Sequence, residues 1–247
     1  MKQSKKILVI GESCRDIFNY GTCKRLCPEA PAPIFNPQNT IENGGMALNV
    51  YNNVTSLSVE VDIQTNKNWA DITKTRFIET SSNHMFMRVD VGDHTYALSD
   101  IKNIKYDEYH AIIISDYNKG YISEEQIQEI SLNHNRVFLD TKKILGTWCK
   151  DVHFIKINEQ EYLKNKYFIT ENLLDKTIIT LGPKGASFKN VVYPVAKVEI
   201  RDVAGAGDSF IAGLVVKYIQ DENIIDAIKF ANSCATRVVQ KRGVSIV

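Results

Sequence analysis

Short runs of consecutive apolar residues recur along the chain and predict buried β-strands. Five such runs are found at residues 7–10, 111–115, 137–140, 152–157 and 177–181. Between them, apolar residues at helical spacing predict helices over 123–132 and 159–166, and Ser123 with Gln126 has the spacing of a capping box. Strands that are apolar throughout and alternate with helices are typical of a parallel sheet covered on both faces, so we expect an α/β fold.

Polar or small residues follow four successive predicted strands. They are Asp116, Asp140, Asn158 and Gly182. Ligands of open α/β sheets bind beyond the carboxyl ends of the strands, so these residues predict one shared cleft. The alternative is that they are polar only because loops after strands generally are.

Two segments interrupt this alternation and resemble exposed strands. Residues 18–36 are extended and contain Pro28, Pro31 and Pro33, which exclude a helix or a central strand. Residues 75–91 alternate between apolar and polar positions like a pair of half-exposed strands. Together the two segments predict a small β-layer beside the main sheet, serving as a lid over the cleft, as a dimer surface, or as both.

The clearest candidate chemistry lies in the stretch RDVAGAGDSF, residues 201–210. Apolar residues from Phe210 to Tyr218 recur at helical spacing and predict a helix over about 208–220. The first amides of a helix are unpaired, and small residues before Asp208 let a phosphate approach them. Asp208 then has two interpretations that the spacing leaves open: a helix N-cap, or a general base for a substrate hydroxyl.

Length and charge exclude several classes of function. A chain of 247 residues can form one large domain, and its net charge of +1 gives no sign of a nucleic-acid or membrane partner. No run of about 18 or more apolar residues predicts a membrane span, and the basic start is too short for a signal peptide. The five cysteines include no Cys-x-x-Cys pair, which favours free thiols in a reducing cytoplasm over a zinc site.

Four motifs, in order along the chain, resemble those of the ribokinase-like (PfkB) carbohydrate kinases. They are GGMALN at 44–49, NEQE at 158–161, TLGPKG at 180–185 and DVAGAGD at 202–208. The resemblance implies a single ribokinase-like kinase domain over 1–247, built as a three-layer sandwich around a mostly parallel sheet. It also implies a small β lid, with strands from about 17–40 and 74–92.

Within this family, the chain is most similar to the D-glycero-β-D-manno-heptose 7-phosphate kinases. The matching segments are residues 11–16, 25–33, 73–76, 88–90 and 115–120. This implies ATP-dependent phosphorylation of the anomeric hydroxyl of D-glycero-D-manno-heptose 7-phosphate. The alternatives are a kinase for another sugar or sugar phosphate, and a catalytically weak protein that binds sugar phosphates or nucleotides.

Two departures from the relatives carry expectations of their own. Such kinases are often fused to an adenylyltransferase domain, and since this chain ends at Val247 we expect that second activity to be absent. Between Asn49 and Lys74 the chain is shorter than the family pattern, so we expect one flank of the sheet, and part of the sugar pocket, to differ.

The resemblance also implies a role for each matching residue. Asp208 would be the base, and the amides of Gly205, Ala206 and Gly207 the anion hole. Sugar contacts would come from Asp16, Gly44, Gly45, Asn49, Lys74, Arg88, Asp116 and Lys119, with Arg76 a further candidate for a sugar phosphate. ATP would be bound by Asn158, Glu161, Thr180, Gly182, Gly185 and Asn232.

Some of these residues also have simpler interpretations. Glu161, helped by Asn158, would hold Mg²⁺ through water; without the resemblance it would be an exposed helix carboxylate. Asp16 alone is equally a turn residue, and Asn232 equally a helix-packing residue. The resemblance further implies a homodimer formed through the lid.

Overall fold

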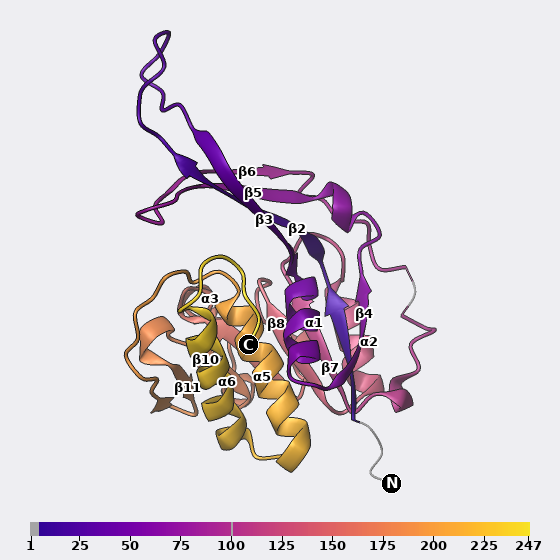
Figure 1. Ribbon diagram of the computed structural model, residues 1–247. Helices are drawn as coiled ribbons and strands as arrows, with labels where there is room; N and C mark the ends of the chain where they lie inside the picture. The colour runs from indigo at the N-terminus through magenta and orange to yellow at the C-terminus, as the bar shows by residue number, and fades with distance from the viewer. Residues whose placement is uncertain (1–4, 100) are drawn as a thin grey trace.

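An eight-stranded, mostly parallel sheet forms the centre of the computed structural model, which describes residues 5–99 and 101–247 (Figure 1). The strand order is β12-β11-β10-β9-β8-β7-β1-β4, and only β11 and β12 run antiparallel to their neighbours. The strands are β1 (Lys6–Gly11), β4 (Glu60–Thr65), β7 (Ala111–Asp116), β8 (Val137–Thr141), β9 (Phe154–Asn158), β10 (Thr177–Thr180), β11 (Ala186–Phe188) and β12 (Val191–Tyr193).

Helices cover both faces of this sheet and complete three layers. One face carries α1 (Ala47–Ser56), α5 (Ala206–Asp221) and α6 (Ile224–Val238), which bury a core with β1, β7 and β8. The other face carries α2 (Glu124–Asn133), α3 (Glu159–Asn165), α4 (Glu171–Leu174) and the 3₁₀ segment Thr147–Cys149. The predicted α/β fold is confirmed, and the reason is the one the sequence suggests: strands apolar on both faces need cover on both sides.

The predicted elements agree with the structure to within a few residues. The capping box of Ser123 and Gln126 is present at the start of α2. The strand predicted at 152–157 begins later, at Phe154, because a turn precedes it. Helix α5 begins at Ala206, two residues before its predicted start.

A second sheet of four strands lies over the carboxyl ends of the central strands (Figure 1). It contains β2 (Ser13–Thr22), β3 (Asn36–Met46), β5 (Thr73–Glu79) and β6 (Met85–Val91), in the order β3-β2-β5-β6. We call this sheet the lid. Residues 23–35, which connect β2 to β3, project away from the body and are called the arm. The lid confirms the predicted β-layer.

The lid is joined to the body through β3. This strand ends at Met46 and α1 begins at Ala47, so no loop separates them. Met46 has a φ of 62°, a conformation that is strained for a residue with a side chain. The strained residue is therefore one of the junctions between the lid and the body.

The short segment between Asn49 and Lys74 accounts for one flank of the central sheet. After α1, the chain forms β4, which pairs with β1 and ends the sheet on that side. Residues 66–72 then lead directly into β5 of the lid, with a single 3₁₀ turn at Trp69–Asp71. The described chain has no further strand on this flank.

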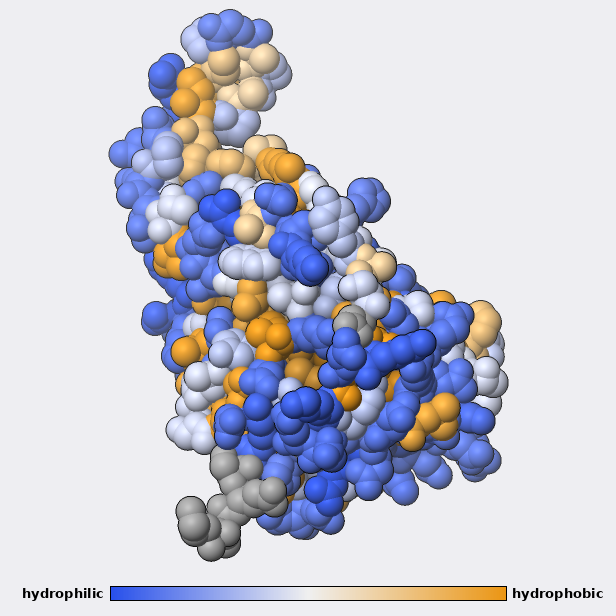
Figure 2. Space-filling model, turned by 90° about the vertical axis from the view of Figure 1, so that its right-hand side faces the viewer, coloured by the Kyte–Doolittle hydropathy of each residue, from blue (hydrophilic) through white to orange (hydrophobic). Residues whose placement is uncertain are grey.

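The lid carries apolar side chains on its outer surface. Alternation along β5 and β6 pairs Thr75 with Val89 and Phe77 with Met87, opposite to the buried Lys74. Met87 is 54% exposed and Val91 is 55% exposed. Figure 2 shows hydrophobic side chains gathered along the lid and arm, above a body face that is largely hydrophilic. None of the helices in the described chain is long and apolar enough to cross a membrane.

Candidate active site

Asp208 is the third residue of α5 and lies beneath the lid, almost fully buried at 6% exposure. Its Oδ2 accepts a hydrogen bond from Asn49 Nδ2 at 2.7 Å, and its Oδ1 accepts one from the Tyr117 hydroxyl at 2.9 Å. The N-cap of α5 is Gly205, and no side chain caps this helix. The N-cap interpretation of Asp208 is therefore wrong, because the glycines before it already form the cap and first turn.

Several neighbours act on the protonation of Asp208. Burial raises its pKa above that of an ordinary aspartate, while the hydrogen bond from Asn49 opposes this rise. The negative charge of Asp140 raises the pKa further, and Tyr117 and Lys156 lower it. A carboxylate held in this way is a stronger proton acceptor than one in water, which suits a general base.

The turn before Asp208 depends on a glycine. Gly205 has a φ of 79°, in the left-handed region, and a Cβ at this position would lie 2.8 Å from Asn49 Nδ2. Only glycine adopts this conformation readily and leaves room for Asn49 to reach Asp208. Gly205 thus fixes both the helix start and one hydrogen bond to the carboxylate.

One of the three amides predicted to form the anion hole, that of Ala206, already has a hydrogen-bond partner in the protein. The Ala206 amide donates to the Val203 carbonyl at 3.3 Å, and the Ser209 amide makes a helical hydrogen bond to Gly205 at 2.9 Å. The amides of Gly207 and Asp208 lie between these two, at the end of the helix that carries partial positive charge. This pair of amides offers the better site for an anion.

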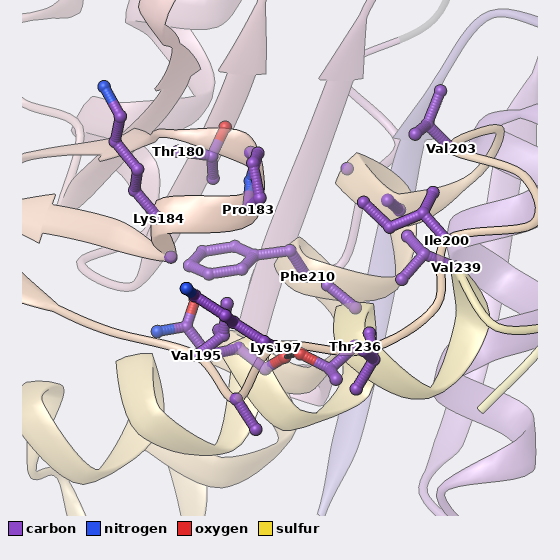
Figure 3. A pocket seen from close by; sticks show the side chains of 18 residues that line it. Thr180, Pro183, Lys184, Val195, Lys197, Ile200, Val203, Phe210, Thr236 and Val239 are labelled. Carbon is purple, nitrogen blue, oxygen red and sulfur yellow. Dashed lines mark hydrogen bonds between the residues drawn. The ribbon is translucent and has the colours of Figure 1, made fainter.

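A cavity of about 580 Å³ opens beside this helix end (Figure 3). It brings together Thr180, Gly182, Gly185 and Asn232, four residues predicted to bind the nucleotide, with Ala206 and Gly207. Its other walls are mostly apolar and include Phe210, Val195, Ile200 and Val239. In Figure 3 the Phe210 ring lies between Pro183 and Lys197. An apolar cavity that ends at helix amides suits a flat base attached to phosphates.

Asn232 and Thr180 have protein partners within this cavity. Asn232 donates to the Tyr193 carbonyl at 2.8 Å, which ties α6 to the end of β12. Thr180 donates to the Ile157 carbonyl at 3.4 Å. Both side chains line the cavity, and Asn232 also has the packing role that its sequence context suggested.

The inner face of the lid carries a cluster of cations. Lys74 is buried, Arg76 forms an ion pair with Asp16, and Arg88 pairs with Asp90 at 2.5 Å. Arg76 and Arg88 are directly opposite each other on β5 and β6. Burial, and then the charge of Arg88, lower the pKa of Arg76. Two guanidinium groups held side by side favour an anion between them.

Lys74 connects these cations to the base. Its Nζ lies 5.5 Å from the centre of the Tyr117 ring, and the Tyr117 hydroxyl donates to Asp208. Burial raises the pKa of the Cys14 thiol, which lies on the same strand as Asp16. Gly45 packs against Cys14 and Asp16, and Gly44 packs against Leu48.

Two more of the predicted sugar-binding residues are held by other protein groups. The Asp116 side chain has no exposure and accepts hydrogen bonds from the Asn118 amide at 3.0 Å, from Lys143 Nζ at 2.7 Å and from Thr141. We therefore assign Asp116 to holding the loop after β7, because its carboxylate offers no surface to a substrate. Lys119 forms an ion pair with Asp93.

Asn158 and Glu161 form a capping box at the start of α3. Glu161 is only 8% exposed, so its interpretation as an exposed helix carboxylate is wrong. Its Oε2 accepts from the Asn158 amide at 2.8 Å, and its Oε1 accepts from Asn158 Nδ2 and Lys142. Most acceptor positions are thus occupied, which fits a contact to the water shell of Mg²⁺ better than direct coordination. The described residues contain no group of three or more side chains arranged to hold a metal.

Two residues of the site escaped the sequence reasoning. Tyr117 follows the strand end at Asp116, and Lys156 forms a 2.7 Å ion pair with Asp140 between the ends of β8 and β9. Tyr117 could not be identified because its partner is 91 residues away. Lys156 did leave a signal, because a charged residue inside an otherwise apolar strand is unusual.

The chain is similar to several known proteins. The family pattern described as pfkB family carbohydrate kinase matches residues 62–247. Bifunctional protein HldE of Helicobacter pylori strain J99 is 30% identical over 294 residues, covering 97% of this chain and 64% of that relative. The HldE protein of Aliarcobacter butzleri is 29% identical, covering 98% of this chain and 62% of its own length. The chain thus spans less than two thirds of these relatives.

Solved structures show the same fold. Arabidopsis thaliana ribokinase complexed with ribose and ATP matches with a TM-score of 0.72 at 12% identity, covering 98% of this chain and 95% of that one. The nucleoside kinase of Methanocaldococcus jannaschii, an archaeal member of the ribokinase family, matches with a TM-score of 0.71 at 16% identity, covering 98% and 94%. The predicted ribokinase-like architecture is confirmed.

Proposed function

The chain belongs to the PfkB family of carbohydrate kinases, and within this family we propose that it phosphorylates the anomeric hydroxyl of D-glycero-D-manno-heptose 7-phosphate. ATP would be the phosphoryl donor and Asp208 the general base. The family makes the protein a phosphotransferase that acts on a sugar hydroxyl. The heptose phosphate and the role of each residue are the proposal.

The proposed reaction follows from what Asp208 and the start of α5 can do. The carboxylate removes the proton of the sugar hydroxyl, and the resulting oxygen attacks the γ-phosphorus of ATP. The bond between this phosphorus and the bridging oxygen breaks, and ADP leaves. The amides of Gly207 and Asp208 would hold the transferred group, and the raised pKa of Asp208 favours proton transfer to it.

The nucleotide would lie in the cavity that ends at Gly207, with its base between apolar walls. Mg²⁺, when bound, would neutralise charge on the ATP phosphates. Glu161 and Asn158 would contact the water shell of the ion, since Glu161 has few acceptor positions left for direct coordination.

The observation that carries the choice of a sugar phosphate is the pair of arginines on the lid. Arg76 and Arg88 are directly opposite each other, and Lys74 is buried beside them. Arg76 and Arg88 pair with Asp16 and Asp90, so together with Lys74 these groups carry an excess of one positive charge. An unphosphorylated sugar offers only hydroxyl groups, whereas a phosphate group matches this excess of charge and the donors of the two guanidinium groups.

A panel of acceptors tests this proposal. We expect ATP-dependent phosphorylation of heptose 7-phosphate with a kcat/KM at least tenfold above that of heptose, ribose or fructose 6-phosphate. Turnover of another sugar phosphate alone would replace the proposed substrate while retaining the lid as the phosphate site. Binding of ATP and sugar phosphate without any transfer would favour a binding protein.

Three further proposals concern the protein as a whole. We propose that residues 1–247 act as one kinase domain, with the lid closing over the body. The apolar outer face of the lid, which includes Phe77, Met87, Val89 and Val91, supports a homodimer formed lid to lid. The free thiols, of which Cys14, Cys149 and Cys234 are buried, support a cytoplasmic location.

A further inference from the structure

Lys156 is a buried lysine whose position the proposed reaction has not yet explained. It lies within β9, is only 4% exposed and has apolar neighbours along the strand. Its Nζ forms a 2.7 Å ion pair with Oδ2 of Asp140, itself 5% exposed. A buried ammonium group is costly, and a strand core is normally apolar, so this pair requires a reason.

The surroundings of Lys156 are unusual for a cation. A Cβ on Gly207 would lie 3.0 Å from Lys156 Nζ, so the ammonium group lies against the second residue of α5. This end of a helix carries partial positive charge, which repels a cation. The positive charge also reaches Asp208, whose pKa it lowers. Asp140 and Asp208 thus both attract the ammonium group, while the helix end repels it.

The other oxygen of Asp140 strengthens this argument. Oδ1 of Asp140 is buried and has no hydrogen-bond partner among the described residues. The pair is therefore not a closed structural contact like that of Lys143 and Asp116, whose carboxylate is fully satisfied. The ammonium group and the two helix amides are donors that suit a phosphoryl group, whereas the unpaired Asp140 oxygen is an acceptor that still needs a donor, such as a water molecule or a substrate hydroxyl.

We propose that Lys156 is a catalytic residue whose ammonium group contacts the γ-phosphoryl group of ATP during transfer. This inference rests on the proposed function, because it takes α5 as the place of phosphoryl transfer. Lys156 donates a hydrogen bond to a non-bridging oxygen and stays protonated throughout. Asp208 accepts the hydroxyl proton, and ADP leaves with the electron pair of the broken bond. Gly207 lacks a side chain because the ammonium group needs that space.

Nucleotide binding tests this role without depending on the sugar. Isothermal titration of the wild type and Lys156→Met with ADP and with the analogue AMP-PNP, each with MgCl₂, compares nucleotides that differ by the γ-phosphoryl group. We expect Lys156→Met to weaken AMP-PNP at least tenfold and ADP less than threefold. We also expect kcat to fall about 10²- to 10³-fold, as when one oxyanion donor is lost.

Two further variants separate contact from folding. Lys143→Met removes a lysine from an ion pair of the same 2.7 Å length in which no residue of α5 takes part, and should leave the ratio of the AMP-PNP and ADP affinities unchanged. The double variant Lys156→Met with Asp140→Leu removes both charges, so no unpaired carboxylate stays buried. The double variant should bind AMP-PNP more weakly relative to ADP, as Lys156→Met does, while still folding, as judged by circular dichroism.

The outcomes distinguish this inference from the proposed function. An unchanged affinity ratio in Lys156→Met and in the double variant would overturn the role of Lys156, and an equal change in Lys143→Met would do the same. Suppose that Lys156→Met weakens AMP-PNP relative to ADP, but the wild type phosphorylates no sugar. This result would support the contact between Lys156 and the γ-phosphoryl group and overturn the proposed acceptor. Turnover of heptose 7-phosphate at full rate by Lys156→Met would retain the function and reject the contact.

Discussion

The Tyr117 hydroxyl donates a 2.9 Å hydrogen bond to Oδ1 of Asp208, from a ring that has the ammonium groups of Lys74 and Lys142 within 5.5 Å of its centre. The backbone of the loop is held in turn by Glu12, which accepts from the amides of Tyr117 and Lys119 at 2.8 and 2.9 Å. A residue on the loop after β7 thus sets the position and proton affinity of a carboxylate on α5.

Replacing Tyr117 with Phe should shift the acidic limb of the pH profile to higher pH. The hydroxyl lowers the pKa of Asp208, so its loss raises that pKa, and the base becomes protonated at a higher pH. We expect the acidic limb of kcat/KM against pH to move to higher pH, with a larger loss at pH 6 than at pH 8. An unmoved limb would show that Tyr117 does not act on the base.

Replacing Asp208 with Asn should abolish turnover and retain nucleotide binding. Loss of a general base costs about 10²- to 10⁴-fold in rate, so we expect kcat to fall by about 10³-fold, with the Kd for ADP changed less than threefold. Burial raises the pKa of Asp208 in the folded protein above its pKa in the unfolded chain. The wild type therefore loses stability as the pH rises from the lower to the higher of these two pKa values. The melting temperature of the variant, relative to that of the wild type, should therefore be higher at neutral pH than at acidic pH.

Replacing Gly205 with Ala should damage the site through Asn49. Its φ of 79° is strained for alanine, and the added Cβ would lie 2.8 Å from Asn49 Nδ2. We expect a loss of about 1–3 kcal/mol in the free energy of unfolding from strain, together with a fall in kcat of about tenfold or more. Gly120→Ala is the matched control, because Gly120 has a φ of 92° with no atom within 4 Å of the added Cβ. Equal losses of kcat would argue against a role for Asn49.

Replacing Arg88 with Met should weaken binding of the sugar phosphate alone. Arg88 is partly exposed and pairs with Asp90, so its loss should cost little stability. A charge-assisted contact to phosphate is worth about 1.5–3 kcal/mol, and we expect KM for the sugar phosphate to rise 10- to 100-fold with KM for ATP unchanged. Arg15→Met is the control, since Arg15 forms a similar two-bond ion pair with Glu42. A similar rise in KM for the sugar phosphate in both variants would show that the rise does not come from a contact on the inner face of the lid.

Replacing Val89 with Lys should convert a lid-to-lid dimer into monomers. Val89 is 38% exposed beside Met87 and Val91, and a charge at the centre of this apolar face opposes its burial. Sedimentation velocity should show a dimeric wild type and a monomeric variant. Leu132→Lys introduces the same charge at an exposed leucine on α2 and should remain dimeric. A monomeric wild type would reject the dimer.

Periodicity alone predicts five of the eight strands of the central sheet, namely β1, β7, β8, β9 and β10, because these strands are largely apolar and are bounded by polar residues. Periodicity does not identify an element whose residues show no clear helical or strand spacing. The start of α5 was placed two residues late, since Gly205 and Gly207 do not look like helix formers although they form its cap and first turn. Strand β4 was missed because its alternating sequence, at the sheet edge, resembles an exposed segment.

The candidate site was predictable only as far as its residues lie in local motifs. Asp208 and its glycines could be identified because one short stretch contains them. Their partners come from other elements: Asn49 from α1, Tyr117 from the loop after β7, and Lys156 from β9. Nothing in the local sequence shows that Asp116 faces inward toward Lys143, and so its carboxylate was assigned to the substrate. Such pairings depend on the order of strands in the sheet.

The absence of a loop between β3 and α1 gives the lid a second effect. Met46 ends β3, and Asn49 lies three residues later on α1, with its amide on Asp208. Because no loop lies between them, a tilt of β3 would be passed directly to the start of α1. Under the proposed closure of the lid over the body, the movement would therefore also reach Asn49, the side chain that orients Asp208. The lid strand and the proposed base would then act as parts of one lever.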